Sequence, residues 1–197
     1  MNYSMRWIAA ALTVSMLSGC AALVVGGAAA TGMAVHDRRS VGTVVDDRLL
    51  RVRVSDALYS NDEFHGDSRI RIMAYNGWVL LAGEAQDQTR IDMATSLIED
   101  VDGVRRVINE LAPIGRVSIP QANHDRWVSS KVNTSLTRVR GVDGFDPTRV
   151  KVLTARNIVY LMGLVTREEG EAAVEQARTV RGVDRVITVF EYIEDTA

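Results

Sequence analysis

The chain contains little cysteine and histidine, with one Cys and three His in 197 residues. A single thiol cannot form an intramolecular disulfide, so no disulfide framework holds this fold. The three histidines, His36, His65 and His124, are far apart, and none has a metal-ligating residue four positions away. No glycine-rich loop is followed by Lys-Ser/Thr, as phosphate binding would require. These absences argue against an enzyme, and no diffusible cofactor is expected.

The chain also lacks an excess of charge of one sign. The formal net charge is -2, and removal of residues 1–19, which carry only Arg6, leaves 22 basic and 25 acidic residues, or -3. A chain so close to neutral is not expected to bind nucleic acid. Hydrophobic residues make up 47% and charged residues 24%, as in ordinary folded proteins. We therefore expect a globular body.

The single cysteine, Cys20, stands at an informative place. Arg6 is followed by an apolar stretch from Trp7 to Leu17, and the small residues Ser18 and Gly19 precede the cysteine. This order is typical of a secretory signal peptide. The segment Leu17-Ser18-Gly19-Cys20 resembles a bacterial lipobox, which implies cleavage before Cys20 and acylation of this residue, with palmitate among the attached lipids. The alternative is a plain signal peptide whose cysteine is incidental.

A second alternative comes from the uncharged stretch that runs from Trp7 to Val35. It is long enough for a transmembrane helix, which needs roughly 20 apolar residues. Its second half, residues 26–32, is rich in Gly and Ala, which favours a flexible tether between a lipid and a folded body. In lipoproteins with this motif the residue after the cysteine directs sorting, and Ala21 implies the outer membrane.

From about residue 45 the chain shows one pattern twice, at a spacing of 78 to 80 residues. Five matched blocks in the same order indicate an internal duplication. The blocks pair Leu50, Val54 and Leu58 with Val128, Val132 and Leu136; residues 70–72 with 150–152; 78–83 with 158–163; Ala94, Ile98 and Val101 with Ala173, Ala177 and Val180; and 106–108 with 185–187.

Each repeat predicts the order α-β-β-α-β. The first and fourth blocks have apolar residues one helical turn apart, and the others have the composition of strands. Asn76-Gly77 favours a tight hairpin turn, and Thr166 is a good helix N-cap. A β-α-β crossover should be right-handed, so we expect an α+β fold in which each repeat is a three-stranded mixed sheet with two helices on one face. Residues 79–81 and 159–161 are apolar on both faces, which suggests that the two sheets pack together.

The order of elements, the strands that end at Gly83 and Gly163, and the helices that end in Val-x-Gly-Val resemble the BON domain. The closer pattern, with residues 37–42 and Trp127, resembles outer-membrane lipoproteins with two BON domains. The expected organisation is a signal peptide (1–19), a lipidated N-terminus and tether (20–44), BON domain 1 (45–113), a linker (114–122), BON domain 2 (123–193) and a short tail (194–197).

The first helix of the second repeat carries a polar stripe with one aromatic residue. At 100° per residue, Trp127, Lys131, Thr134 and Arg138 lie about 130° from the core stripe. An indole beside two cations suits the headgroup region of a membrane. The alternative is that Trp127 packs under the other domain or the linker while the cations are merely solvated.

Charge is distributed unevenly in the second repeat. Residues 124–156 contain seven basic and three acidic side chains, and residues 157–197 contain four basic and eight acidic ones, so the first helix lies on the positive side. The acidic pairs Asp46-Asp47 and Glu168-Glu169 are interpreted as solvated residues at helix starts.

The resemblance implies binding of anionic phospholipid, such as phosphatidylglycerol or cardiolipin, through this first helix of the second domain. Carried over, the contact residues are Trp127, Lys131, Thr134 and Arg138. It further implies a periplasm-facing protein on the outer membrane that supports envelope integrity and gathers at division sites. The alternative is an adaptor that docks envelope assembly proteins through the same stripe without binding lipid.

Overall fold

The computed structural model describes residues 37–115 and 118–194. Cys20, the expected signal peptide and most of the expected tether lie outside these residues. From Arg38 onward the chain forms one compact unit. All described helices and strands belong to this unit.

The unit contains the two expected repeats. The first consists of α4 (Val41–Tyr59), the short 3₁₀ helix η1 (Asp62–Phe64), β1 (Arg69–Tyr75), β2 (Trp78–Ala85), α5 (Gln88–Glu99) and β3 (Arg106–Pro113). The second consists of α6 (Ile119–Leu136), η2 (Pro147–Arg149), β4 (Val150–Ala155), β5 (Ile158–Val165), α7 (Arg167–Arg178) and β6 (Arg185–Tyr192). In each sheet the middle strand pairs antiparallel with the first strand and parallel with the third. The predicted α+β architecture is confirmed.

The apolar stripes of the first helices form the centres of two equivalent cores. Leu50, Val54 and Leu58 of α4 are buried against one face of the first sheet, and Val128, Val132 and Leu136 of α6 are buried against one face of the second. The second helix of each repeat, α5 or α7, covers the same sheet face. Helical spacing thus identified the core faces correctly, because each helix has only one sheet to pack on.

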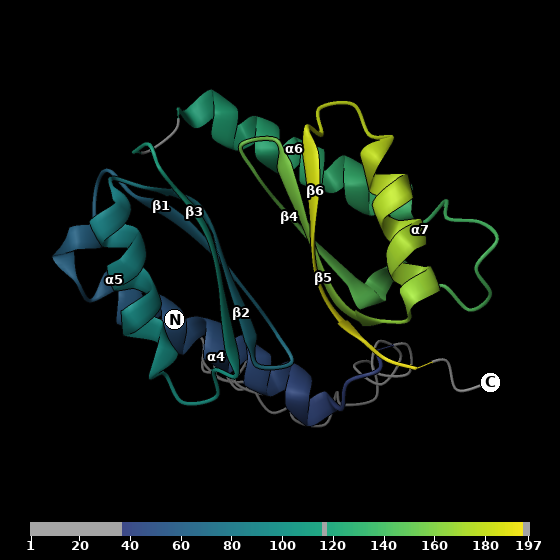
Figure 1. Cartoon of the computed structure of the whole chain (residues 1–197), viewed down its shortest axis with the longest axis horizontal. Coiled ribbons are helices and arrows are strands. Elements are labelled where there is room, and N and C mark those ends of the chain that lie inside the picture. Colours follow the sequence, from purple (N-terminus) through teal and green to yellow (C-terminus); the bar gives the residue numbers. More distant parts are fainter. Residues whose placement is uncertain (1–36, 116–117, 195–197) are drawn as a thin grey trace, which may run out of the picture. The chain divides into compact units, whose positions relative to one another are not determined.

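The other faces of the two sheets pack against each other, with the helices outside (Figure 1). Leu80 of β2 and Tyr160 and Met162 of β5 lie at the centre of this third core and are fully or almost fully buried. The predicted packing between the sheets is therefore confirmed. The layers run helices, sheet, sheet, helices, so the two pairs of helices lie on opposite outer sides of the unit.

A buried carboxylate from the first helix binds the hairpin turn in each repeat. Asp47 accepts hydrogen bonds from the backbone N–H groups of Asn76 and Gly77, at 2.6 and 2.9 Å. Asp125 accepts bonds from the backbone of Arg156 and Asn157, at 3.1 and 3.0 Å. The central residues of both turns have positive φ, as the tightest hairpin turns require.

Gly83 and Gly163 stand where the middle strand passes very close to its antiparallel neighbour. A Cβ atom on Gly83 would lie 2.2 Å from the carbonyl oxygen of Arg69, and one on Gly163 would lie 2.4 Å from that of Arg149. Gly83 also has a φ of +123°, which side-chain-bearing residues rarely adopt. These glycines are therefore required by the strand pairing.

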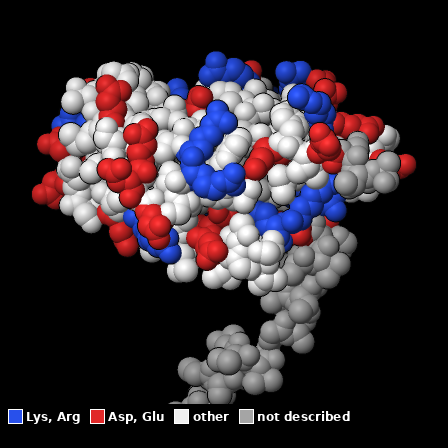
Figure 2. Space-filling view, turned by 60° about the horizontal axis from the view of Figure 1, so that its bottom comes forward, with Lys and Arg blue, Asp and Glu red and all other residues white. Residues whose placement is uncertain are grey.

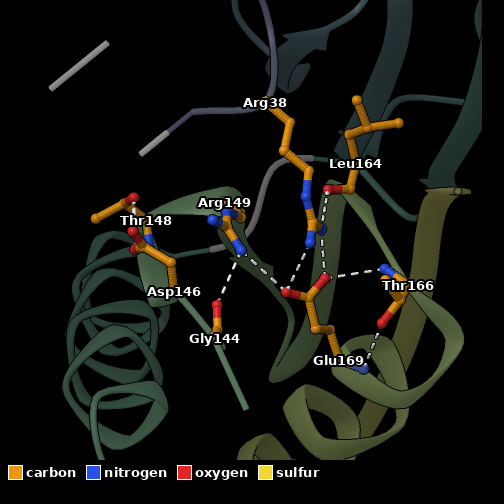
Figure 3. A network of polar contacts seen from close by, with 8 residues as sticks. All are labelled: Arg38, Gly144, Asp146, Thr148, Arg149, Leu164, Thr166 and Glu169. Atoms are coloured by element: carbon orange, nitrogen blue, oxygen red, sulfur yellow. Dashed lines mark hydrogen bonds and ion pairs between the residues drawn. The ribbon is translucent and has the colours of Figure 1, made fainter. Parts of the chain in front are cut away.

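Arg38 joins the segment before α4 to the second repeat, as Figure 3 shows. Its guanidinium group donates to the Glu169 carboxylate and to the Leu164 carbonyl oxygen. Arg149 donates to the same carboxylate at 3.0 Å. Glu169 also accepts from the backbone N–H of Thr166, whose side chain caps α7 in a capping box. The predicted N-cap at Thr166 is confirmed.

The interpretation of the acidic pairs as solvated is wrong for one residue of each pair. Asp47 and Glu169 are buried, because backbone N–H groups and arginines satisfy their oxygens. Asp47 lies in the second turn of α4 rather than at its start, and Arg39 both binds its carboxylate and stacks on the ring of Tyr75.

Two expected boundaries change. The helix α4 begins at Val41, capped by the Ser40 side chain, so residues 41–44 are helical and do not belong to the tether. The helix α6 begins at Ile119 after the Ser118 cap, so residues 119–122 do not belong to the linker. In both cases a serine N-cap starts the helix before its first buried apolar residue.

Candidate functional site

The helix α6 is held firmly in place by its ends and by its inner face. The Ser118 hydroxyl accepts a bond from the backbone N–H of Gln121, and Pro120 occupies the first turn, where a missing N–H costs nothing. Its inner face contributes three fully or almost fully buried apolar residues to the core. The buried Asp125 connects it to the hairpin turn that joins β4 and β5. The outer face of α6 is therefore presented on a rigid support.

Trp127 lies on this outer face and is 50% exposed. The alternative that it packs under the other domain or the linker is therefore wrong. Its indole contacts the ring of His124, with 5.5 Å between centroids, and the Lys131 ammonium lies 3.9 Å from the indole centroid. A cation at this distance over an aromatic face is an attractive arrangement worth about 0.5–1 kcal/mol at an exposed site. Trp127 and Lys131 thus form one amphipathic unit.

The two other predicted contact residues differ in their surroundings. Thr134 is exposed on α6, and its hydroxyl donates to the carbonyl oxygen of Ser130. Arg138 is exposed but lies beyond the last helical residue, Leu136, so the expectation that the helix extends through Arg138 is wrong. The backbone of Arg138 instead forms a turn by donating to the Ser135 carbonyl oxygen at 2.8 Å.

Two further residues on the outer face were not predicted. Ile119, at the start of α6, is 69% exposed. Arg126 is exposed and binds the Asn123 side chain. Ile119 precedes Trp127 by eight residues, or about 12 Å along a helix. At 100° per residue, Ile119 and Trp127 lie about 40° to either side of the direction that points straight away from the core. That spacing could have identified Ile119 had the helix start been placed correctly.

The exposed charges of α6 all have the same sign. Its one acidic residue, Asp125, is buried and bonded to backbone N–H groups, whereas Arg126 and Lys131 reach the surface, followed by Arg138 in the turn. The surface thus combines apolar side chains with exposed positive charge. Such a surface can bind an anionic group beside an apolar phase, which is how amphipathic helices bind membranes.

The described residues provide no other site of clear chemistry. Between residues 37 and 194, outside the gap at 116–117, no three His, Cys, Asp or Glu side chains are grouped to hold a metal ion. His65 stacks near Tyr59, His124 contacts Trp127, and His36 lies outside the described residues. None of the helices in this part of the chain is both long and apolar enough to cross a membrane.

The chain is similar to several known proteins. The family model described as the BON domain matches residues 46–112 and 124–194. The outer membrane lipoprotein DolP of Haemophilus influenzae is 35% identical over 90% of this chain and 91% of its own length. The 21 kDa hemolysin of Actinobacillus pleuropneumoniae is 35% identical over 80% of each chain. Among solved structures, the C-terminal domain of CdsD from Chlamydia trachomatis has a TM-score of 0.30 at 10% identity, over 74% of this chain and 98% of that one.

Proposed function

The chain belongs to the BON-domain family and contains two such domains, and we propose that it is an outer-membrane lipoprotein that binds anionic phospholipid through α6. The name of the relative from Haemophilus influenzae supports the location. The lipobox-like segment supports attachment of lipid at Cys20, with the folded body in the periplasm. The proposed lipid contacts are Trp127, Lys131, Thr134 and Arg138.

The observation that carries this proposal is the unit formed by Trp127 and Lys131. An indole favours the headgroup region, where its ring is partly in hydrocarbon and its N–H meets water or phosphate. The Lys131 ammonium, 3.9 Å from the indole centroid, is brought to the same depth. Lys131 is half-buried. A long lysine side chain can keep its carbons on apolar surface while its charge reaches headgroup phosphates.

The expected affinity of this contact is modest. Each basic side chain near an anionic surface contributes about 1 kcal/mol. Transfer of roughly 100 Å² of exposed indole surface from water adds about 2–3 kcal/mol. A lipid on Cys20 would hold α6 near the bilayer and raise its effective concentration there. A weak contact then suffices to orient the body on the membrane, where the protein would support outer-membrane integrity, including at division sites.

Binding to vesicles tests the proposal. The chain from residue 20 onward, with Cys20→Ser to prevent acylation, is co-sedimented with vesicles of phosphatidylcholine alone or with phosphatidylglycerol or cardiolipin added. We expect binding only to the anionic vesicles, a loss of at least tenfold in Trp127→Glu, and a loss of about fivefold in Lys131→Gln. The matched control is Leu49→Glu, because Leu49 is the equivalent position of α4 and is equally exposed, at 48%. Unchanged binding by Trp127→Glu would refute the lipid assignment.

A second candidate function is an adaptor that docks an envelope assembly protein through the same stripe. The exposed Trp127 favours this candidate as well, because aromatic residues are enriched at protein interfaces. A photoreactive amino acid at position 127 distinguishes the two. Adducts with phospholipid support the first function, and an adduct with a single protein supports the second.

A further inference from the structure

The helix α4 exposes an apolar stripe that its own domain does not cover. Its members share one side of the helix and are each between 46 and 61% exposed: Val41, Val45, Leu49 and Val52. They account for four of the eight large apolar side chains that are exposed among residues 37–115 and 118–194. Single exposed apolar residues are common, but a contiguous row of four over three turns indicates an interaction surface.

This stripe cannot be an extension of the core. At 100° per residue it is centred about 180° from the buried stripe of Leu50, Val54 and Leu58. A helix that packs on one sheet needs only one apolar side, and α4 has a second one turned toward solvent. The core of the first domain therefore does not account for the second stripe, which is available for contact with a partner.

The charges beside the stripe differ from those on α6. The exposed charged side chains of α4 are Asp46 and Asp56 together with Arg48, Arg51 and Arg53. On the side of the molecule that carries α4, Figure 2 shows acidic and basic residues interspersed with uncharged surface. An anionic bilayer attracts cations but repels carboxylates, so it suits α6 and does not suit α4. A protein surface can offer complementary charges of both signs.

The position of α4 also favours a protein partner over the bilayer, and this inference rests on the proposed function. The helices α4 and α6 lie on opposite outer sides of the packed sheets (Figure 1). With α6 on the bilayer, the stripe of α4 points away from it. A second copy held on the same bilayer through its own α6 would have to turn over to reach that stripe, which disfavours self-association.

We propose that the stripe of Val41, Val45, Leu49 and Val52 is the docking surface for a different envelope protein, which presents an apolar helix face flanked by acidic and basic side chains. The stripe extends over 11 residue steps, or about 16 Å, which matches three turns of a partner helix. So small an area is characteristic of a weak or transient interaction. Domain 2 would then bind lipid, and domain 1 would bind protein.

Photocrosslinking of the full acylated chain in its own outer membrane tests this proposal. Benzoylphenylalanine replaces Leu49, and the matched control places it at Arg178, an exposed position on α7. We expect one protein adduct from position 49 that is absent from position 178, with the partner identified by mass spectrometry. Adducts with phospholipid, adducts with a second copy of the chain, or no adduct would each overturn the proposal.

The identified partner is then purified, and its affinity for the chain is measured directly. We expect a loss of at least tenfold in Val45→Asp and Leu49→Glu and less than twofold in Trp127→Glu. Binding to anionic vesicles should instead fall at least tenfold in Trp127→Glu and less than twofold in Val45→Asp and Leu49→Glu. Failure of this proposal is therefore distinguishable from failure of the lipid assignment. If Leu49→Glu does not fold, as judged by circular dichroism, Val52→Lys takes its place. Equal affinity of the variants and the unmodified chain would refute the docking surface.

Discussion

The guanidinium group of Arg38 is bound to the carboxylate of Glu169, which lies 131 positions later in the chain. Arg38 lies three residues before the start of α4 in the first domain, and Glu169 belongs to the capping box of α7 in the second. This ion pair therefore fixes the start of the first domain on the second. It also assigns a structural role to the Asp37-Arg38-Arg39-Ser40 segment, which the sequence alone identified only by resemblance.

Loss of this pair should weaken the folded unit. We expect Arg38→Gln to lower the free energy of unfolding at pH 7 by about 1–2 kcal/mol, because Glu169 stays buried with one fewer partner. Urea unfolding followed by circular dichroism measures the change. Arg178→Gln is the control, since its pair with Glu175 is solvent-exposed and should contribute less than about 0.5 kcal/mol. Equal effects of the two substitutions would contradict the prediction.

The same carboxylate should make stability depend on acid pH. Burial raises the pKa of Glu169, but hydrogen bonds from Arg38 and the Thr166 backbone outweigh it, so the pKa lies below its usual value. A lowered pKa stabilises the fold above the unfolded value, near 4.3, and this contribution disappears as pH falls through the folded value. The gap in urea midpoint between the unmodified chain and Glu169→Gln should therefore narrow from pH 6 to pH 3. A constant gap would show that Glu169 does not titrate as described.

Both buried aspartates should stabilise the fold. Asp47→Ala and Asp125→Ala each leave two backbone N–H groups of a hairpin turn without their acceptor, which should cost about 2–3 kcal/mol. Asp46→Ala is the control, because this exposed neighbour should change stability by less than about 0.5 kcal/mol. Thermal or urea unfolding of the three variants measures this. A cost at Asp46 similar to that at Asp47 would show that burial is not the cause.

A methyl group at the strand glycines should be poorly tolerated. Gly83→Ala and Gly163→Ala would force Cβ atoms against the carbonyl oxygens of Arg69 and Arg149, and we expect the free energy of unfolding to fall by more than about 2 kcal/mol. Gly42→Ala is the contrasting control, because Gly42 is helical and its Cβ would meet only the Ser40 hydroxyl, at 3.6 Å. That change should stabilise the protein by about 0.5–1 kcal/mol. A stable, normally folded Gly83→Ala would refute the close approach of the strands.

Much of the fold was predictable from the sequence for local reasons. Helical spacing identified Leu50, Val54 and Leu58 and their counterparts as core residues, and doubly apolar strands predicted the packing of the two sheets. Helix starts were less predictable, since α4 and α6 begin at serine caps several residues before their first buried residue. The sequence identified Trp127 as a candidate contact but missed Ile119, because the start of α6 was placed too late.

The sequence by itself determined the duplication, the order of elements in each repeat and the faces of the helices that enter the core. The elements and the helix faces follow from residue spacing over a few turns. The duplication follows because both repeats show the same spacing. Only the tertiary structure decided that Asp47 and Glu169 are buried and that α4 and α6 expose apolar surface on opposite sides. Burial of a charge depends on partners such as Arg38 that lie far away in the sequence, and the direction of an exposed face depends on how the two sheets meet.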